Sequence, residues 1–304
     1  MTTHRFVPTT WYNTLGTHPV ALTVESGDTV VTETIDAGGW DKDGRQVWGG
    51  PNPMNGPIAV AGAEPGDSLL VEIVDMVPIA PTGWTRPMLA VNVVDPIFAR
   101  DVLQPGERTF WNIERNARTA RLAEPPAPLK DFDLPLEPMI GCFGVAPELG
   151  QAISTATSAE HGGNMDYRRF CPGTQVAFPV ATAGALFFLG DCHAAQGDGE
   201  IVGTGIETCF EVTVRLTVQK GRRITWPRGE TADDIFTVGN ARPLDQALQH
   251  ATTEMAKWLM EEFGHDITSA SHLMGQTVAY DIGNVFDPAY TVACRIPKKW
   301  LPKR

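Results

Sequence analysis

The chain has 304 residues, of which 20% are charged and 42% hydrophobic, a balance typical of globular proteins and not of disordered chains. Its formal net charge of −12 argues against nucleic acid and anionic membranes as partners, since either would require a basic surface. No apolar run approaches the roughly 18 residues of a membrane-spanning helix. No secretory signal is visible and the five cysteines form no CxxC pair, so we expect a cytoplasmic protein with reduced thiols.

Two early segments share a turn followed by a strand-like run. They are ESGDTVVTETID at 25–36 and EPGDSLLVEIVD at 64–75, and PGTQVAFPV at 172–180 is a weaker third version. A Gly-Asp turn that leads into β-branched and aliphatic residues is a strand signal. The segments therefore predict strands of a sandwich or barrel, with their aspartates as turn residues. We interpret Glu33 and Asp36 as structural too, although both could line the mouth of a pocket.

The last quarter of the chain contains the clearest helical pattern. Apolar residues recur at helical spacing over 244–259, which predicts a helix that ends near Gly264. The same spacing places Leu248 on the buried stripe and Glu254 on the solvent side. A shorter helix and two strands are expected over 268–296.

Short strands are also expected at 109–113 and 117–122. Together these patterns predict a mainly β fold with added α/β elements. We expect a β-sandwich-like core at about residues 15–220 and a helical C-terminal part at 240–304, within a single domain spanning 1–304.

The densest polar cluster lies between two predicted strands at 185–189 and 206–216. Within it stand Asp191, Cys192, His193, Gln196, Asp198 and Glu200, interrupted by glycines at 190, 197 and 199. Carboxylates with an imidazole on a tight loop between strands can hold a cation or move protons. A plain polar turn is the alternative. The four carboxylate or imidazole groups and the buried character of the first strand favour a site.

A second polar cluster, HGGNMD at 161–166, leads to a family resemblance. This motif, together with GALFFLGDCHAAQGDGEIVGTGIE at 184–207 and MIGCFGVAPE at 139–148, closely resembles the acetamidase/formamidase family. Further agreement at 26–39 and 56–67 extends the resemblance over nearly the whole chain, in what looks like the family's shorter branch. The resemblance implies a β-sandwich-like core with added helices, hydrolysis of C–N bonds in small amides, and a metal at the site.

Four residues are candidate metal ligands. Asp191 and His193 are two residues apart at the end of a strand, so their side chains point the same way and can reach one ion. Carboxylate and imidazole suit zinc or a similar first-row metal, and calcium is the other possibility. Asn164 and Asp166 form a second such pair that could complete the coordination.

Amide hydrolysis also needs an activated water, an acid for the leaving nitrogen and a sink for negative charge. Glu200 is the candidate general base and acid, although it could instead cap a turn. Glu207 could hold a metal-bound histidine or contact the leaving ammonia. Gln196, Asp198 and His161 are candidate substrate-binding residues, with turn formation as the alternative for the last two.

Other readings of the same residues lead to other functions. Cys192 could be a thiol nucleophile, but on a strand it would point away from His193. A cyclic imide or a carbamate could be the substrate, or the loop could bind an ion without catalysis. We favour a cytoplasmic, metal-dependent amidohydrolase whose partner is a small linear carboxamide, assembled as a homodimer or higher homo-oligomer.

Overall fold

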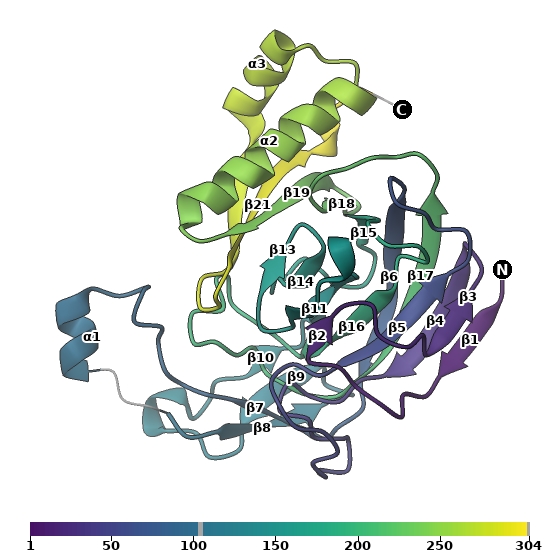
Figure 1. Cartoon of the computed structure of the whole chain (residues 1–304). Coiled ribbons are helices and arrows are strands. Elements are labelled where there is room, and N and C mark those ends of the chain that lie inside the picture. The colour runs from purple at the N-terminus through teal and green to yellow at the C-terminus, as the bar shows by residue number, and fades with distance from the viewer. Residues whose placement is uncertain (103–105, 303–304) are drawn as a thin grey trace.

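The computed structural model describes residues 1–102 and 106–302, and most of its regular structure is β-sheet (Figure 1). The largest sheet has nine strands, in the order β1 (Thr3–Phe6), β4 (Asp28–Glu33), β17 (Phe210–Gln219), β6 (Ser68–Pro78), β15 (Gln175–Pro179), β18 (Arg228–Glu230), β19 (Asp234–Ala241), β21 (Tyr290–Pro297) and β20 (Ala279–Asn284). The second sheet has six strands, in the order β13 (Ser158–Ala159), β14 (Gly162–Asn164), β11 (Met139–Val145), β16 (Phe187–His193), β5 (Met54–Val60) and β3 (Leu22–Val24).

Two smaller sheets and three α-helices complete the fold. The four-stranded sheet has the order β10 (Leu134–Pro135), β9 (Thr119–Leu122), β8 (Thr109–Glu114) and β7 (Thr82–Thr85), and a two-stranded sheet pairs β12 (Ile153–Ser154) with β2 (Thr14–Leu15). The helices are α1 (Pro96–Val102), α2 (Leu244–Glu262) and α3 (Ile267–Thr277). Figure 1 shows α1 at the end of an extension that carries β7 and β8, and the sequence pattern did not predict this helix.

The two large sheets share one apolar core, which confirms the predicted sandwich-like class. Val71 and Val214 of the nine-stranded sheet belong to the same buried cluster as Phe143 and Phe187 of the six-stranded sheet. Strand β17 alternates buried and half-buried residues, as expected for a sheet with one covered face. Every residue of β11 and β16 is buried, so these two strands are covered on both faces. This doubly covered position explains why polar residues on β16 are shielded from water.

The repeated Gly-Asp turns act as the sequence predicted. Gly27 and Gly66 have φ of 93° and 96°, a region that favours glycine, immediately before β4 and β6. Asp28 accepts a hydrogen bond from the backbone of Glu25 at 3.2 Å, and Asp67 accepts one from Glu64 at 2.9 Å. Both aspartates therefore stabilise the turns that start these strands.

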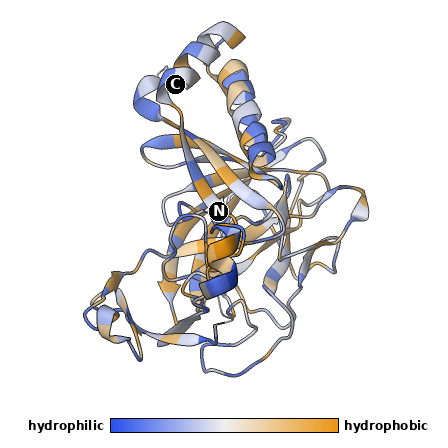
Figure 2. Ribbon diagram, turned by 90° about the vertical axis from the view of Figure 1, so that its left-hand side faces the viewer, coloured by the Kyte–Doolittle hydropathy of each residue, from blue (hydrophilic) through white to orange (hydrophobic). Residues whose placement is uncertain are grey.

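The C-terminal helices pack on the end of the large sheet, and Figure 2 shows both polar and apolar residues along them. Helix α2 begins at the predicted residue and ends just before Gly264. Two predictions about its faces were wrong: Leu248 is 38% exposed, and Glu254 is fully buried. The burial of Glu254 is compensated by an ion pair, because its Oε1 lies 2.7 Å from Nε of Arg228, which is itself buried on β18.

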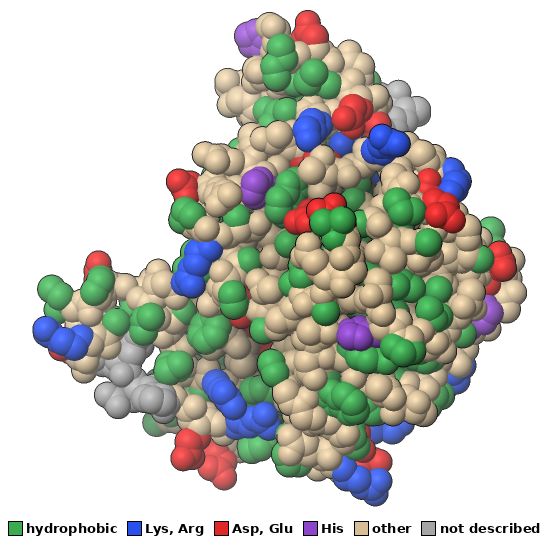
Figure 3. Space-filling view, viewed as in Figure 1, with side chains coloured by type: hydrophobic (Ala, Val, Ile, Leu, Met, Phe, Trp, Pro, Cys, Tyr) green, Lys and Arg blue, Asp and Glu red, His purple; other side chains and the backbone are tan. Residues whose placement is uncertain are grey.

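The predicted boundary near residues 220–240 does not separate two sheets, because β18 to β21 continue the nine-stranded sheet. None of the helices in the described ranges is long and apolar enough to cross a membrane. On the face shown in Figure 3, basic side chains of the described residues are scattered among acidic ones and form no continuous basic area.

Candidate active site

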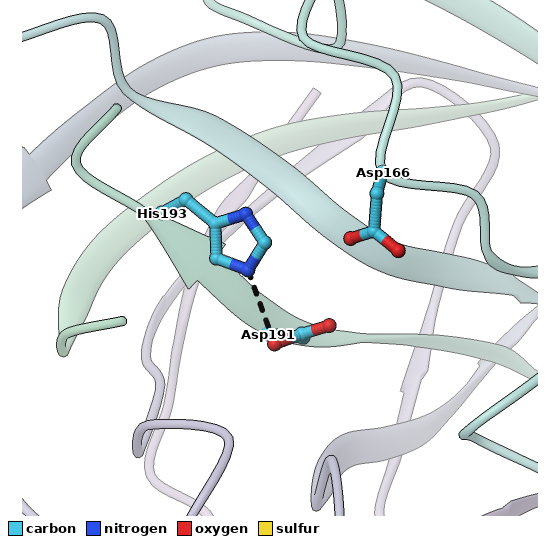
Figure 4. Close-up of side chains that lie close together, drawn as sticks. All are labelled: Asp166, Asp191 and His193. Carbon is cyan, nitrogen blue, oxygen red and sulfur yellow. Dashed lines mark hydrogen bonds and ion pairs between the residues drawn. The ribbon is translucent and has the colours of Figure 1, made fainter. Parts of the chain in front are cut away.

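The centre of the site is the end of β16, where alternate side chains face opposite sides of the sheet. Cys192 points into the apolar core between the large sheets. Asp191 and His193 lie on the other side, and His193 Nε2 is 3.3 Å from Asp191 Oδ1. Figure 4 shows this pair on one strand and Asp166 facing it from an adjoining segment. The spacing that predicted a shared direction for Asp191 and His193 thus brings the two side chains together.

Gln196 fixes the orientation of the imidazole. Its Nε2 donates to the backbone carbonyl of Asp166 at 2.6 Å, so its Oε1 is the atom that faces His193. That oxygen lies 2.8 Å from His193 Nδ1 and therefore accepts the Nδ1 proton. Nε2 is then the imidazole nitrogen that faces the carboxylates. Gln196 thus positions the histidine and is not part of the lining of the cavity beside the site, so its contact with substrate stays a prediction.

Glu207 lies directly across from His193. The two residues form an isolated β-bridge, and Glu207 Oε1 is 3.0 Å from His193 Nε2. Its other oxygen, Oε2, is buried without a hydrogen-bond partner among the described residues. Gly205 makes this approach possible, since a Cβ atom at that position would collide with the imidazole.

A second group of carboxylates surrounds Asn284. Its side-chain Nδ2 lies 2.7 Å from Asp166, 2.9 Å from Glu200 and 2.8 Å from Asp287. The backbone of Gly199 pairs with β20 at Asn284, and this bridge brings the loop that carries Glu200 to the cluster. Three carboxylates thus converge on one amide, and Asp166 Oδ1 remains buried without a partner among the described residues.

Three residues of this site were missed by the sequence analysis. Asn52 donates to Asp191 Oδ2 at 2.9 Å and to Asn164 Oδ1 at 3.0 Å, and Asn164 donates to Asp287 at 2.5 Å. Asn52 stands in a loop, Asn284 is the last residue of β20, and Asp287 lies in the short turn between β20 and β21. The only available signal was the length of the polar loop that carries Asn52.

Burial and like charges shift the protonation of these carboxyls. Burial, with Asp191 and Asp287 adding to it, raises the pKa of Asp166 well above its usual value. Burial and the neighbouring Asp166 do the same to the pKa of Glu200. Burial also raises the pKa of Glu207 to about 8, against the opposing effect of His193.

The imidazole responds in the opposite sense. Burial alone would lower the pKa of His193, but the carboxylates of Glu207 and Asp191 outweigh burial and raise it well above its usual value. The cluster therefore attracts positive charge, either as protons or as a cation.

Backbone strain is concentrated at the same place. Asn52, Asp166, Asp191 and Glu200 have φ between 44° and 52°, and they are half of the non-glycine residues with positive φ in the described chain. Such conformations persist where the surroundings enforce them, and they cluster at functional sites. Gly141 lies opposite Asp191 in the β11–β16 pairing, and a Cβ atom there would collide with Asp166 Oδ1.

A cavity of about 410 Å³ opens onto this cluster. Asp191, Glu200, Glu207 and Asp287 line it from the acidic side. Its remaining lining includes Asn52, Trp84, Arg86, Met88, Arg108, Thr204 and Phe286. The lining of the cavity therefore combines acidic side chains with aromatic and basic ones.

Several predicted site residues lie away from this cavity. Asp198 is 59% exposed and lies 3.8 Å from Arg168 on the surface, a position that does not support substrate binding. His161 is buried with neither ring nitrogen hydrogen-bonded in the described chain, and burial lowers its pKa to about 4. Neither residue lines the cavity. Glu33 pairs with Arg5 and Lys42 at the surface, as expected for a structural residue.

Cys192 is poorly suited to be a nucleophile. Its side chain is fully buried in the core, and burial raises its pKa above that of an ordinary thiol. A thiolate is the reactive form, so both effects disfavour attack on a substrate.

Three sets of donor atoms are close enough to hold a metal ion. Within each set the donors lie within 4.8 Å of one another; the sets are Asp166, Asp191 and His193; His193, Glu200 and Glu207; and Asp166, Glu200 and Asp287. The buried oxygens Asp166 Oδ1 and Glu207 Oε2 have no hydrogen-bond partner among the described residues, so they are available as ligands for a cation. The imidazole favours zinc or another first-row metal over calcium, which prefers oxygen ligands.

Comparison with known proteins identifies the family of this chain. A family model described as the Acetamidase/Formamidase family matches residues 17–150 and 148–299. The chain belongs to the acetamidase/formamidase family. A solved structure of this family, an acetamidase from Yersinia enterocolitica, superimposes with a TM-score of 0.86 at 31% identity, over 99% of this chain and 93% of that one. An acetamidase structure from Bacillus halodurans gives 0.83 at 29% identity, over 98% of each chain.

Sequence comparison finds longer relatives. An acetamidase from Mycolicibacterium smegmatis is 30% identical over 240 residues, which are 63% of this chain and 59% of the relative. The chain thus spans about three fifths of the length of the curated relatives that it matches.

Proposed function

We propose that this protein hydrolyses the C–N bond of small linear carboxamides, of the formamide or acetamide type, to a carboxylate and ammonia with the help of a divalent metal. Membership of the acetamidase/formamidase family supports the amide as substrate. The observation that carries the proposal is a cluster of five buried or nearly buried carboxylates beside the cavity, four of which share a set of neighbouring donor atoms with one imidazole.

Asp166, Asp191 and His193 are the residues that would hold the metal, which we propose to be zinc. When bound, a divalent cation supplies Lewis acidity, which lowers the pKa of water and polarises an amide carbonyl. His193 presents Nε2 to this set because Gln196 holds Nδ1. Asn52 keeps Asp191 in place through its second oxygen.

Glu200 is the proposed general base and acid. It lines the cavity, and Asn284 holds its Oε2 at 2.9 Å. Its raised pKa makes it a strong enough base to take a proton from the attacking water and a suitable acid to pass it to the leaving nitrogen. Glu207 lies beside His193, with Oε1 3.0 Å from Nε2, and its second oxygen, which has no partner among the described residues, is the proposed contact for the leaving ammonia.

Ammonia release from formamide, acetamide, propionamide and a cyclic imide tests this proposal, with and without prior chelation. We expect turnover of the linear amides that chelation abolishes and added metal restores, and that persists in Cys192→Ala. Turnover that survives chelation but is lost in Cys192→Ala would instead support the thiol mechanism.

A cytoplasmic location and a homo-oligomeric assembly remain predictions. Light scattering of the purified protein measures the assembly, for which we expect a dimer or a higher homo-oligomer.

A further inference from the structure

The cavity is larger than formamide or acetamide requires. Its volume of about 410 Å³ falls in the range of roughly 300–1,000 Å³ that is typical of sites for much larger small molecules. An amide of three or four non-hydrogen atoms would occupy only the part beside the carboxylates. The rest of the cavity can therefore select a longer acyl group.

The wall of this remaining space carries two arginines around one tryptophan. The guanidinium carbon of Arg108 lies 4.0 Å from the centre of the Trp84 ring, and that of Arg86 lies 5.9 Å from it. Within the described chain, neither guanidinium forms a hydrogen bond or an ion pair. Most surface arginines of this acidic protein do pair with carboxylates, as Arg121 does with Asp133 at 2.8 Å. Both guanidinium groups in this cavity wall therefore lack an ion-pair partner among the described residues.

Trp84, which contacts both arginines, is itself held in place by hydrogen bonds. Its Nε1 donates to Asp36 at 2.8 Å, and its backbone forms two hydrogen bonds with Glu207, of 3.0 and 2.9 Å. Burial raises the pKa of Asp36, and Arg108 lies close enough for its charge to oppose this rise. The oxygens of Asp36, however, already accept from Trp84, Gly38 and Trp40. The basic wall is therefore connected directly to the residue beside His193, and its positive charge remains available to a ligand.

We propose that the preferred substrates are anionic carboxamides, namely the monoamides of short dicarboxylic acids, whose free carboxylate binds Arg108 and Arg86. The inference rests on the amidase function proposed above and specifies its substrate class. Guanidinium groups recognise carboxylates through paired, charge-assisted hydrogen bonds. The amide group would then lie at Glu200 and Glu207 and the free carboxylate at the arginines, so the acidic and basic parts of the lining match the two groups of the substrate.

The test compares each monoamide with its neutral diamide of the same size: malonamate with malonamide, succinamate with succinamide, and glutaramate with glutaramide. The measured quantity is the ratio of kcat/KM for the anionic to that for the neutral compound within one enzyme preparation, which cancels any general loss of activity. Acetamide turnover is measured in parallel. The variants are Arg108→Gln, Arg108→Lys and Arg86→Gln, and the control is Arg100→Gln, an exposed residue that pairs with Asp101 on α1.

For the best chain length, the wild-type enzyme should show a kcat/KM at least about ten times higher for the monoamide than for the diamide. The diamide lacks the carboxylate and so loses a charge-assisted hydrogen bond of this worth. Arg108→Gln should bring this ratio close to one, Arg108→Lys should restore part of it, and Arg100→Gln should leave it unchanged. A wild-type ratio near or below one for all three pairs, with acetamide hydrolysed, would overturn the anionic substrate class and leave the amidase function intact. Turnover of none of these amides would contradict both proposals.

Discussion

Beneath α2, the buried Arg228 guanidinium meets the buried Glu254 carboxylate at 2.7 Å. Beside the cavity, among the described residues, five carboxylates form a cluster that contains only one imidazole, that of His193. The remaining partners of Arg228, Glu261 and Glu262, reach solvent with exposures of 50% and 27%. In the first region the buried charges balance, so the pair can serve structure alone. In the second they do not balance, and buried like charges are costly unless a cation or protons compensate them. The difference identifies the second region as a binding site.

The largest effect is expected when a proposed metal ligand is removed from the carboxylate cluster around His193. We expect Asp191→Ala to lose bound metal and at least about a hundredfold of amide turnover, more than is typical when a residue merely supporting a metal ligand is removed. The protein should stay folded, since the change removes one of several mutually repelling carboxylates.

Elemental analysis, ammonia release and circular dichroism check this prediction together. Asp198→Ala is the matched control, because that carboxylate lies at the surface, and it should retain metal and activity. An active, metal-replete Asp191→Ala protein would remove Asp191 from the ligand set.

Substitutions in the Arg228–Glu254 ion pair should change the stability of the protein and not its catalytic activity. Arg228→Met leaves Glu254 buried without its charged partner, so we expect a loss of about 3–5 kcal/mol in the free energy of unfolding. Urea unfolding measures this loss, and turnover per folded molecule should stay unchanged. The double variant Arg228→Met/Glu254→Leu should recover much of it, and a double variant as unstable as the single one would show that the ion pair is not the cause.

Metal binding should stabilise the unbalanced region specifically. At a free metal concentration of a hundred times Kd, the folded protein should gain about 2.7 kcal/mol. Arg228→Met should be less stable without metal but should gain the same stability when metal is added. Asp166→Asn should lose most of this gain. Thermal unfolding with and without metal measures both, and an equal increment in Asp166→Asn would place the ion elsewhere.

The smallest expected effect concerns pH. The pKa of Glu207 is raised from 4.5 to about 8 and that of His193 is raised above 6.5, so the folded, metal-free protein binds more protons than the unfolded chain between pH 6.5 and 8. Its stability should therefore fall as pH rises through this window. Glu207→Gln should flatten the slope of Tm against pH in chelator-treated protein. A metal-free Tm that rises over this window would contradict the assigned protonation.

The sequence predicted those parts of the site that depend on local geometry. Asp191 and His193 share a direction because strand side chains alternate, and the same alternation turns Cys192 into the core. The turn role of Asp28 and Asp67 also follows from a few neighbouring residues.

Contacts between distant segments were not predictable in this way. Asn52 reaches Asp191 across 139 positions and Asn284 reaches Asp166 across 118, so no local pattern marks them. Glu254 was misplaced for the same reason, since its position on α2 looked solvent-facing until β18 brought Arg228 beneath it. Asp198 looked functional because it is close in sequence to Glu200, yet the loop turns it outward.

Metal titration of chelator-treated protein tests the central claim most directly, with bound metal and acetamide turnover measured on the same samples. The account predicts that ammonia release rises in proportion to bound metal and that Asp191→Ala neither binds the metal nor recovers. Full turnover in metal-free wild-type protein would contradict it.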